Sequence, residues 1–167
     1  MKHKVIKKQH NSRMCLVCGI DNKLGLKASF YELDNKELIA IFKPVEEHQS
    51  YPERLHGGIS ATILDETLGR AITIEEETIW GVTVELNIKY KKPVPLDQEL
   101  KVVAKVTRNA SRMFEAEGRI ILANGDIAVT ATGKYIKMSL DKIADVSDED
   151  VAWNIVETEN DVNEVEY

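Results

Sequence analysis

The sequence predicts an α+β protein in which one antiparallel sheet of about six strands wraps around a single long central helix. Two patterns lead to this fold class. Apolar residues recur at four-residue spacing over residues 57–72, which is typical of a helix with one buried face. Apolar and polar residues alternate over residues 82–90 and again over 100–106, which is typical of half-buried strands.

The order of the elements excludes a parallel nucleotide-binding sheet, because that architecture alternates strands with helices. A hairpin comes first, then the helix, then four strands joined by short connections. Residues 44–54 form a polar loop between prolines, and residues 124–126, Asn-Gly-Asp, supply a hairpin turn. The expected strands cover residues 26–33, 37–42, 82–90, 100–106, 113–122 and 127–138.

Length and composition indicate one ordinary globular domain. The 167 residues are 43% hydrophobic and 30% charged, enough to bury a core without disulfides. No apolar run approaches the roughly 20 residues that span a bilayer. The basic residues 1–9 are not followed by the apolar stretch of a secretory signal, so a cytoplasmic protein without membrane association is expected.

Charge divides the chain into three parts. Residues 1–14 form a basic N-terminal extension, residues 15–140 the folded domain, and residues 141–167 an acidic tail with ten Asp and Glu and one Lys. An acidic tail behind a near-neutral body gives no basic stripe for nucleic acid. The tail is expected to be a solvating appendage, although Trp153, Ile155 and Val156 could dock on the body.

Cys15 and Cys18 are the only cysteines, in a single Cys-x-x-Cys. This spacing suits a redox dithiol or half of a zinc site. Zinc takes about four ligands, and the histidines show no paired spacing; they are His3, His10, His48 and His56. Two reduced cysteines, no metal and no cofactor are therefore expected.

His56-Gly57-Gly58 stands where the predicted helix begins. The first amides of a helix have no internal partner, and together with the helix dipole they favour negative charge. A carbonyl oxygen placed there would be polarised as in an oxyanion hole. The alternative is that the two glycines only form a tight junction between loop and helix.

Asp65 is a carboxylate between apolar helix neighbours, and burying such a charge without a partner or a role is costly. The alternative is a surface carboxylate, either paired to Arg70 or solvated beside Glu66.

At these residues the sequence resembles a known family. The run LHGGISATILDETLG (residues 55–69) resembles the helix signature of hotdog-fold thioesterases of the PaaI-like group, in which an Asp follows the His by nine positions, as Asp65 follows His56. The segments CLVCGIDNKLGL (15–26) and GVTVELNIKYKKPV (81–94) resemble the leader and the central strand of that group. The resemblance covers roughly residues 15–137.

The resemblance implies a hotdog-fold acyl-CoA thioesterase that releases a free acid and coenzyme A. The Gly57 amide would polarise the thioester carbonyl, and Asp65 would act as nucleophile or general base. Eight residues of helix separate these two groups by about 12 Å, too far for both to touch one carbonyl. The family's dimer, with antiparallel helices, would bring Gly57 of one chain to Asp65 of the other. A homodimer is therefore required, and a homotetramer is possible.

Other roles follow from the same resemblance. His56 would orient the loop or the thioester, Thr83 would hold the attacking water, and Ser50 stands where the family often has Asn. Coenzyme A carries phosphates, so cations and amides should surround its entrance. The substrate-binding candidates are Gly58, Lys89, Lys91, Lys92, Arg108, Asn109 and Arg112, with Lys134 and Lys137 as weaker ones. The acyl pocket is expected from Ile59, Ile63, Leu64 and Tyr51.

The charged candidates have an alternative as solvated charges that protect strand edges. Two other functions also stay open: a hotdog-fold enoyl-CoA hydratase or acyl-carrier-protein dehydratase, and a non-enzymatic acyl-CoA-binding module. Hydratase chemistry usually needs a His and an acid in one site, and sensors usually carry a helix-turn-helix, which the sequence lacks before Cys15.

Overall fold

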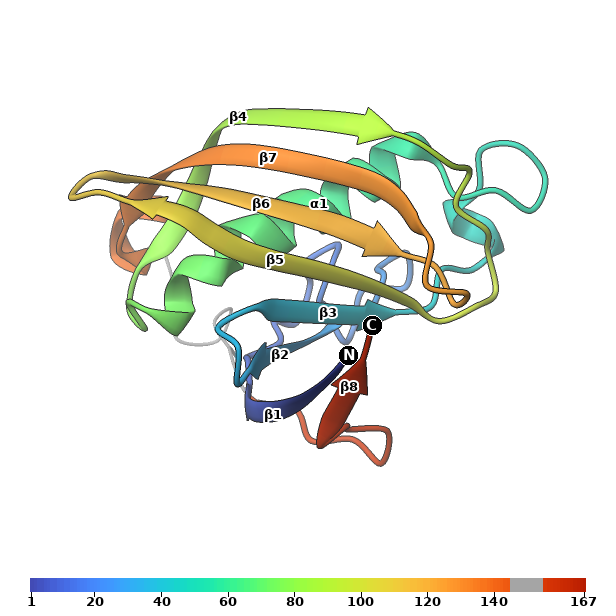
Figure 1. Cartoon of the computed structure of the whole chain (residues 1–167), viewed down its shortest axis with the longest axis horizontal. Helices are drawn as coiled ribbons and strands as arrows, with labels where there is room; N and C mark the ends of the chain where they lie inside the picture. The colour runs from blue at the N-terminus through green and yellow to red at the C-terminus, as the bar shows by residue number, and fades with distance from the viewer. Residues whose placement is uncertain (145–154) are drawn as a thin grey trace.

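The computed structural model describes residues 1–144 and 155–167. One antiparallel sheet curves around helix α1 (Gly57–Arg70), which confirms the predicted fold class (Figure 1). The sheet has eight strands instead of about six, in the spatial order β4-β7-β6-β5-β3-β2-β1-β8. The strands are β1 (Lys2–Lys8), β2 (Ser29–Leu33), β3 (Leu38–Phe42), β4 (Trp80–Tyr90), β5 (Leu100–Asn109), β6 (Met113–Ile121), β7 (Ile127–Met138) and β8 (Glu164–Glu166).

The two additional strands come from the two ends of the chain, where no strand was predicted. β1 pairs with β2 and β8 pairs with β1, so both termini lie at one edge of the sheet (Figure 1). Opposite charges meet there: the Lys2 ammonium lies 2.8 Å from Glu164, and the Met1 amino group donates to a main-chain carboxylate oxygen of Tyr167 at 2.6 Å. The basic and acidic ends of the sequence are thus complementary partners.

The end of the acidic tail covers apolar side chains on the sheet. Val165 is buried in a small cluster with Tyr31, Ile39 and Val103, on the sheet face turned away from α1. Ile155 is exposed, and Val156 is partly buried and accepts a hydrogen bond from Lys8 through its carbonyl. Trp153 lies outside the described residues. This part of the tail therefore packs on the body.

α1 begins at Gly57 as predicted and ends at Arg70, where a 3-10 turn (Ala71–Ile74) continues the chain. Its apolar stripe packs against the concave face of the sheet and is fully buried from Ile63 onward, whereas Ile59 is partly buried. A Cβ at Gly118 of β6 would lie 2.5 Å from Leu68 Cδ1, so only a glycine permits this close approach. Gly69 likewise lies against the ring of Tyr135, which explains a glycine inside the helix.

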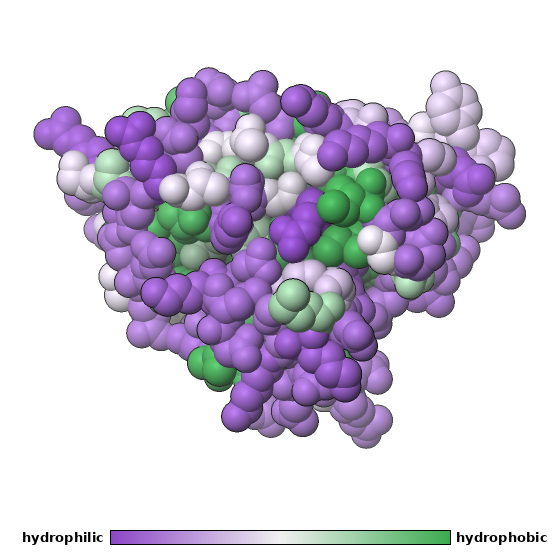
Figure 2. Space-filling view, viewed as in Figure 1, coloured by the Kyte–Doolittle hydropathy of each residue, from purple (hydrophilic) through white to green (hydrophobic). Residues whose placement is uncertain are grey.

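The opposite face of the sheet is mostly hydrophilic, with separate apolar patches between the charges (Figure 2). Within the described residues, none of the helices has the length and the apolar character that crossing a bilayer requires.

β4 forms the other edge of the sheet. Its 11 residues pair with β7 along one side, and the register shifts between Thr83 and Glu85. Within the described chain, no strand pairs with its second side. A long unpaired edge is a template for pairing with another chain.

The contact between α1 and β6 predicts the effect of a truncation. Leu68→Ala should lower the free energy of unfolding by about 2–5 kcal/mol, because Leu68 is fully buried and the cavity cannot collapse onto Gly118. Ile6→Ala, at a side chain that is 62% exposed, is the control and should change it by roughly 0.5 kcal/mol or less. Urea unfolding measures both. Equal losses for the two variants would contradict the described packing.

Candidate functional site

Asp65 lies in the third turn of α1, between the helix and the start of β4. Thr83 Oγ1 donates to Asp65 Oδ1 at 2.8 Å, and the Tyr135 hydroxyl donates to the same oxygen at 3.2 Å. Asp65 Oδ2 accepts no hydrogen bond from the described residues. Arg70, the alternative ion partner, is paired with Glu66 instead, with Nε 2.8 Å from Oε1. One carboxylate oxygen is therefore held and the other is available.

Tyr135 was not singled out from the sequence. Burial raises the pKa of its hydroxyl, and the negative charge of Asp65 raises it further, so the hydroxyl stays protonated and donates. Its ring stacks on Phe114 with 5.0 Å between the centroids. The alternation of inward and outward residues along β7 could have indicated that Tyr135 faces the helix, but not which helix residue it meets.

A pocket of about 190 Å³ opens beside Asp65. Glu66, Arg70 and Thr83 supply its other polar side chains. Its apolar wall comes from Trp80, Val82, Leu140 and Ile143, the last two on the short helix α2 (Leu140–Ile143).

The start of α1 is capped by His56. Its Nδ1 accepts from the Gly58 amide at 2.9 Å, so this amide is already used within the chain. The Gly57 amide donates to no acceptor in the described residues. The Tyr90 hydroxyl donates to the Gly57 carbonyl at 2.8 Å and ties β4 to the first turn. The geometry therefore leaves the Gly57 N–H as the free donor and gives His56 a structural contact.

A second pocket, of about 330 Å³, opens beside Gly57. Lys91 and Lys92 line it, so two of the expected cations lie next to the free amide. Asp65 does not line this pocket, and Gly57 does not line the pocket of Asp65. A single chain thus keeps the two groups apart, in agreement with the separation of about 12 Å along the helix.

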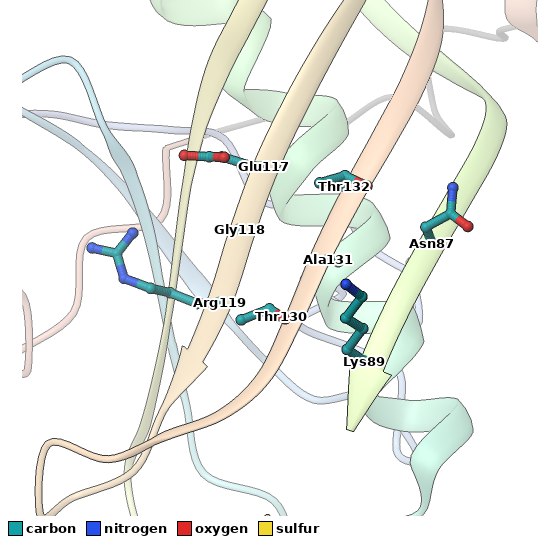
Figure 3. Close-up of a pocket in the computed structure, with 8 residues that line it drawn as sticks. All are labelled: Asn87, Lys89, Glu117, Gly118, Arg119, Thr130, Ala131 and Thr132. Carbon is teal, nitrogen blue, oxygen red and sulfur yellow. The ribbon is translucent and has the colours of Figure 1, made fainter. Parts of the chain in front are cut away.

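The other expected cations lie elsewhere. Lys89 lines a cavity of about 310 Å³ on the sheet face away from α1 (Figure 3), where the strand register pairs it with Thr130 of β7, and Thr130 with Arg119 of β6. The strand register places Arg108, Asn109 and Arg112 at the end of the sheet where Trp80 lies. Tyr90 and Lys91 lie at the other end.

Most of these distant side chains have carboxylate partners. Asn109 donates to Glu75 and Glu76, and Arg108 lies 3.5 Å from Glu115. Lys134 pairs with Glu85 and Lys137 with Glu76. One chain does not gather the predicted cations into one entrance.

The prediction that Ile63 and Leu64 line an acyl pocket is wrong for the single chain. Ile63 and Leu64 are fully buried in the core and line no opening beside either group, because they form the stripe that faces the sheet. Ile59 is partly buried against the same core, and Tyr51 is 77% exposed on the loop. Ser50 is also exposed, and among the described residues only its backbone makes hydrogen bonds, such as that to the Arg54 carbonyl.

Comparisons with known proteins agree with this architecture. The family model described as Thioesterase superfamily matches residues 53–129. The chain is 28% identical over 123 residues to acyl-coenzyme A thioesterase 13 of Mus musculus, which covers 74% of this chain and 82% of that protein. It is 33% identical over 133 residues to acyl-coenzyme A thioesterase THEM4 of Rattus norvegicus, covering 74% of this chain and 54% of that protein.

A solved structure shares the fold as well. The crystal structure of a thioesterase superfamily protein superposes with a TM-score of 0.69 at 27% identity, over 74% of this chain and 60% of that one. The chain thus spans little more than half of some relatives. The helix wrapped in an antiparallel sheet and the solved structure show the hotdog fold, and the family match and the relatives show that this chain is similar to members of the thioesterase superfamily.

Proposed function

We propose that the protein hydrolyses acyl-CoA to a free acid and coenzyme A, at a site that two protomers share. The observation that carries this proposal is a pair of groups on α1: the Gly57 amide and one oxygen of the Asp65 carboxylate, neither of which has a hydrogen-bond partner among the described residues. Two relatives are named acyl-coenzyme A thioesterases, which supports this thioester as the substrate. Lys91 and Lys92 beside Gly57 suit the phosphates of coenzyme A, which would replace Asp126 as the ion partner of Lys92.

In the proposed mechanism, the thioester carbonyl oxygen accepts the Gly57 N–H at the positive end of the helix dipole. This donor stabilises the negative charge that develops on the oxygen when the carbonyl carbon is attacked. Asp65 Oδ2 of the partner subunit either takes a proton from the attacking water or attacks the carbon itself. Thr83 and Tyr135 hold Oδ1 and so orient the free oxygen.

Collapse of the tetrahedral intermediate breaks the carbon–sulfur bond and expels the thiolate of coenzyme A. On the general-base route the water oxygen ends in the acid, and the proton that Asp65 has taken returns to the thiolate. On the nucleophilic route a mixed anhydride forms first, and water then hydrolyses it to the acid and free Asp65.

The free edge of β4 supports a specific dimer. Within one chain, β4 contacts Asp65 through Thr83 and contacts the start of α1 through Tyr90. If two β4 edges pair antiparallel around an axis between Leu86 and Asn87, Thr83 lies opposite Tyr90 of the partner subunit. Asp65 then comes toward Gly57 of the partner subunit, and symmetry forms two equal sites.

Replacement of the carboxylate tests the chemistry. Asp65→Asn keeps the size of the side chain and a hydrogen-bond acceptor for Thr83, but it removes the base or nucleophile. Turnover of a panel of short, long and aromatic acyl-CoAs, followed by thiol release, should fall at least about 10²-fold. Asp97→Asn, the same change at an exposed turn, is the control. Unchanged turnover in Asp65→Asn would remove Asp65 from the mechanism, and tight binding without turnover in the wild type would favour a binding module.

Removal of one amide proton tests the oxyanion site. Gly57→Pro deletes the N–H at the first helical position, where proline is well tolerated, and His56 already has the extended backbone that precedes proline. The turnover number should fall by about 10²–10³, the cost of losing one oxyanion donor. Gly57→Ala keeps the N–H and adds only a Cβ at 3.5 Å from the Tyr90 ring, so it should lose far less. Equal losses for the two variants would refute the role of the amide.

Mixing the two inactive proteins tests the shared site. A dimer of one Gly57→Pro chain and one Asp65→Asn chain contains one site with both groups intact if the site lies between chains. Co-refolding the two variants should then restore turnover, to about one quarter of wild type if chains pair at random. If both groups came from the same chain, no site would be complete and the mixture would stay inactive.

A further inference from the structure

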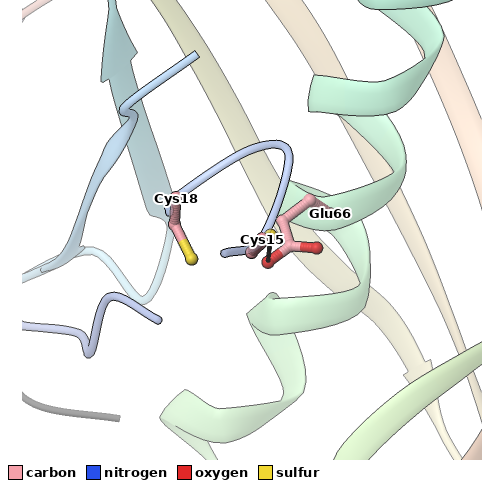
Figure 4. Close-up of side chains that lie close together, drawn as sticks. All are labelled: Cys15, Cys18 and Glu66. Carbon is pink, nitrogen blue, oxygen red and sulfur yellow. Dashed lines mark hydrogen bonds between the residues drawn. The ribbon is translucent and has the colours of Figure 1, made fainter. Parts of the chain in front are cut away.

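Cys15 and Cys18 lie directly beside the pocket of Asp65. Cys15, Cys18 and Glu66 offer ligand atoms that all lie within 4.8 Å of one another, which brings the leader segment against α1 (Figure 4). Cys18 is fully buried, whereas Cys15 is partly exposed. Glu66 belongs both to this cluster and to the wall of the Asp65 pocket.

Arg70 connects the two cysteines with that pocket. Its side chain is buried, and it donates through Nη2 to Cys18 Sγ at 3.1 Å and through Nε to Glu66 at 2.8 Å. Its guanidinium also lies over the rings of Phe30 and Trp80, and Trp80 lines the Asp65 pocket. A buried guanidinium needs anions close to it; Glu66 supplies one, and the hydrogen bond from Arg70 to the Cys18 sulfur favours the thiolate form of Cys18.

The arrangement suits a dithiol better than a metal site. The cluster has three ligand atoms where zinc takes about four, and Arg70 donates to two of the three groups, which puts a positive charge where a cation would bind. The hydrogen bond with Cys15 and the charge of Arg70 lower the pKa of Cys18, although burial opposes them. The pKa of Cys15 is raised by the hydrogen bond with Cys18 and by burial, so the pair shares one proton.

The turn that joins the cysteines keeps them close. The Val17 amide donates to Cys15 Sγ at 3.3 Å, and the Gly19 amide donates to the Cys15 carbonyl at 2.8 Å. A Cβ at Gly19 would lie 2.3 Å from that carbonyl oxygen, so a glycine is required. The turn therefore holds the partly exposed Cys15 next to the buried Cys18.

We propose that Cys15 and Cys18 are a thiol–disulfide exchange site, which a small-molecule disulfide oxidises to an intramolecular disulfide that alters the Arg70 wall of the Asp65 pocket. In the first step Cys15 gives its proton to the Cys18 thiolate, and its sulfur attacks the disulfide RSSR to form Cys15–S–SR and release RS⁻. The proton on Cys18 then passes to the released RS⁻. Cys18 Sγ attacks Cys15 Sγ, forms the internal disulfide and expels the second RS⁻, so two electrons pass from the pair to RSSR.

The consequence for the pocket is electrostatic. As half of a disulfide, Cys18 carries no negative charge, so of the two groups in the described residues that accept from Arg70 through their side chains, Glu66 keeps its charge and Cys18 does not. Because Arg70, Glu66 and Trp80 all line the Asp65 pocket, its wall changes with the redox state. This holds for any ligand of the pocket and does not depend on acyl-CoA hydrolysis.

Thiol labelling and intact-mass measurement test the exchange. Reduced full-length protein is incubated with glutathione disulfide, and the remaining thiols are alkylated. The wild type should lose both labelling sites and retain no glutathione, whereas Cys18→Ser should keep one glutathione on Cys15. Persistent labelling of both wild-type cysteines, a stable wild-type adduct, or a bound zinc ion that Cys15→Ser releases would each overturn the proposal.

Trp80 fluorescence tests the coupling to the pocket. The sequence has two tryptophans, so Trp153→Phe leaves Trp80 as the single reporter. Its emission should change on oxidation and return on reduction with dithiothreitol. The same protein with Cys15→Ser and Cys18→Ser should not respond to glutathione disulfide. Closure of the disulfide without a change in emission would refute the coupling, whatever the outcome of the turnover assays.

Discussion

The burial of one straight helix inside a curved sheet is the constraint on which the rest of this molecule depends. Because the sheet covers the apolar stripe of α1, the helix can present chemistry only at its first turn and along its uncovered side. Gly57 lies in the first turn, and Asp65 lies on the uncovered side. A helix rises about 1.5 Å per residue, so no rearrangement of side chains brings these groups to one carbonyl. The distance within one chain is therefore the physical argument for two chains.

The strand next to the helix connects these two positions. At one end of β4 the Thr83 hydroxyl donates a hydrogen bond to Asp65, and at the other end the Tyr90 hydroxyl donates one to the carbonyl of Gly57. The same strand has a free edge, so the element that orients both groups is also the element available for pairing. In the proposed dimer, the pairing of two β4 edges would then both join the protomers and arrange the site.

The opposite edge of the sheet is built from the two ends of the chain. A basic first strand and an acidic last strand pair there, and Val165 covers apolar residues that the other strands leave open. Charge patterning along the sequence located both segments, but it suggested a solvating appendage for the acidic tail and no partner for the basic extension. Their mutual attraction depends on the termini being close in space, which no local pattern can encode.

The sequence by itself determined the α+β class, the bounds of α1 to within a few residues and most of the strands, since these follow from local periodicity. It also indicated the residues at the helix start and Asp65, because the spacing between His56 and Asp65 matches the helix signature of the family that the sequence resembles. Only the tertiary structure decided which partners they have. Tyr135 meets Asp65 across 70 residues, Arg70 joins Cys18 to Glu66, and Ile63 and Leu64 face the core instead of a pocket. These contacts arise from how the helix is rotated against the sheet, and that rotation is set by the packing of the whole core, including the close approach at Gly118.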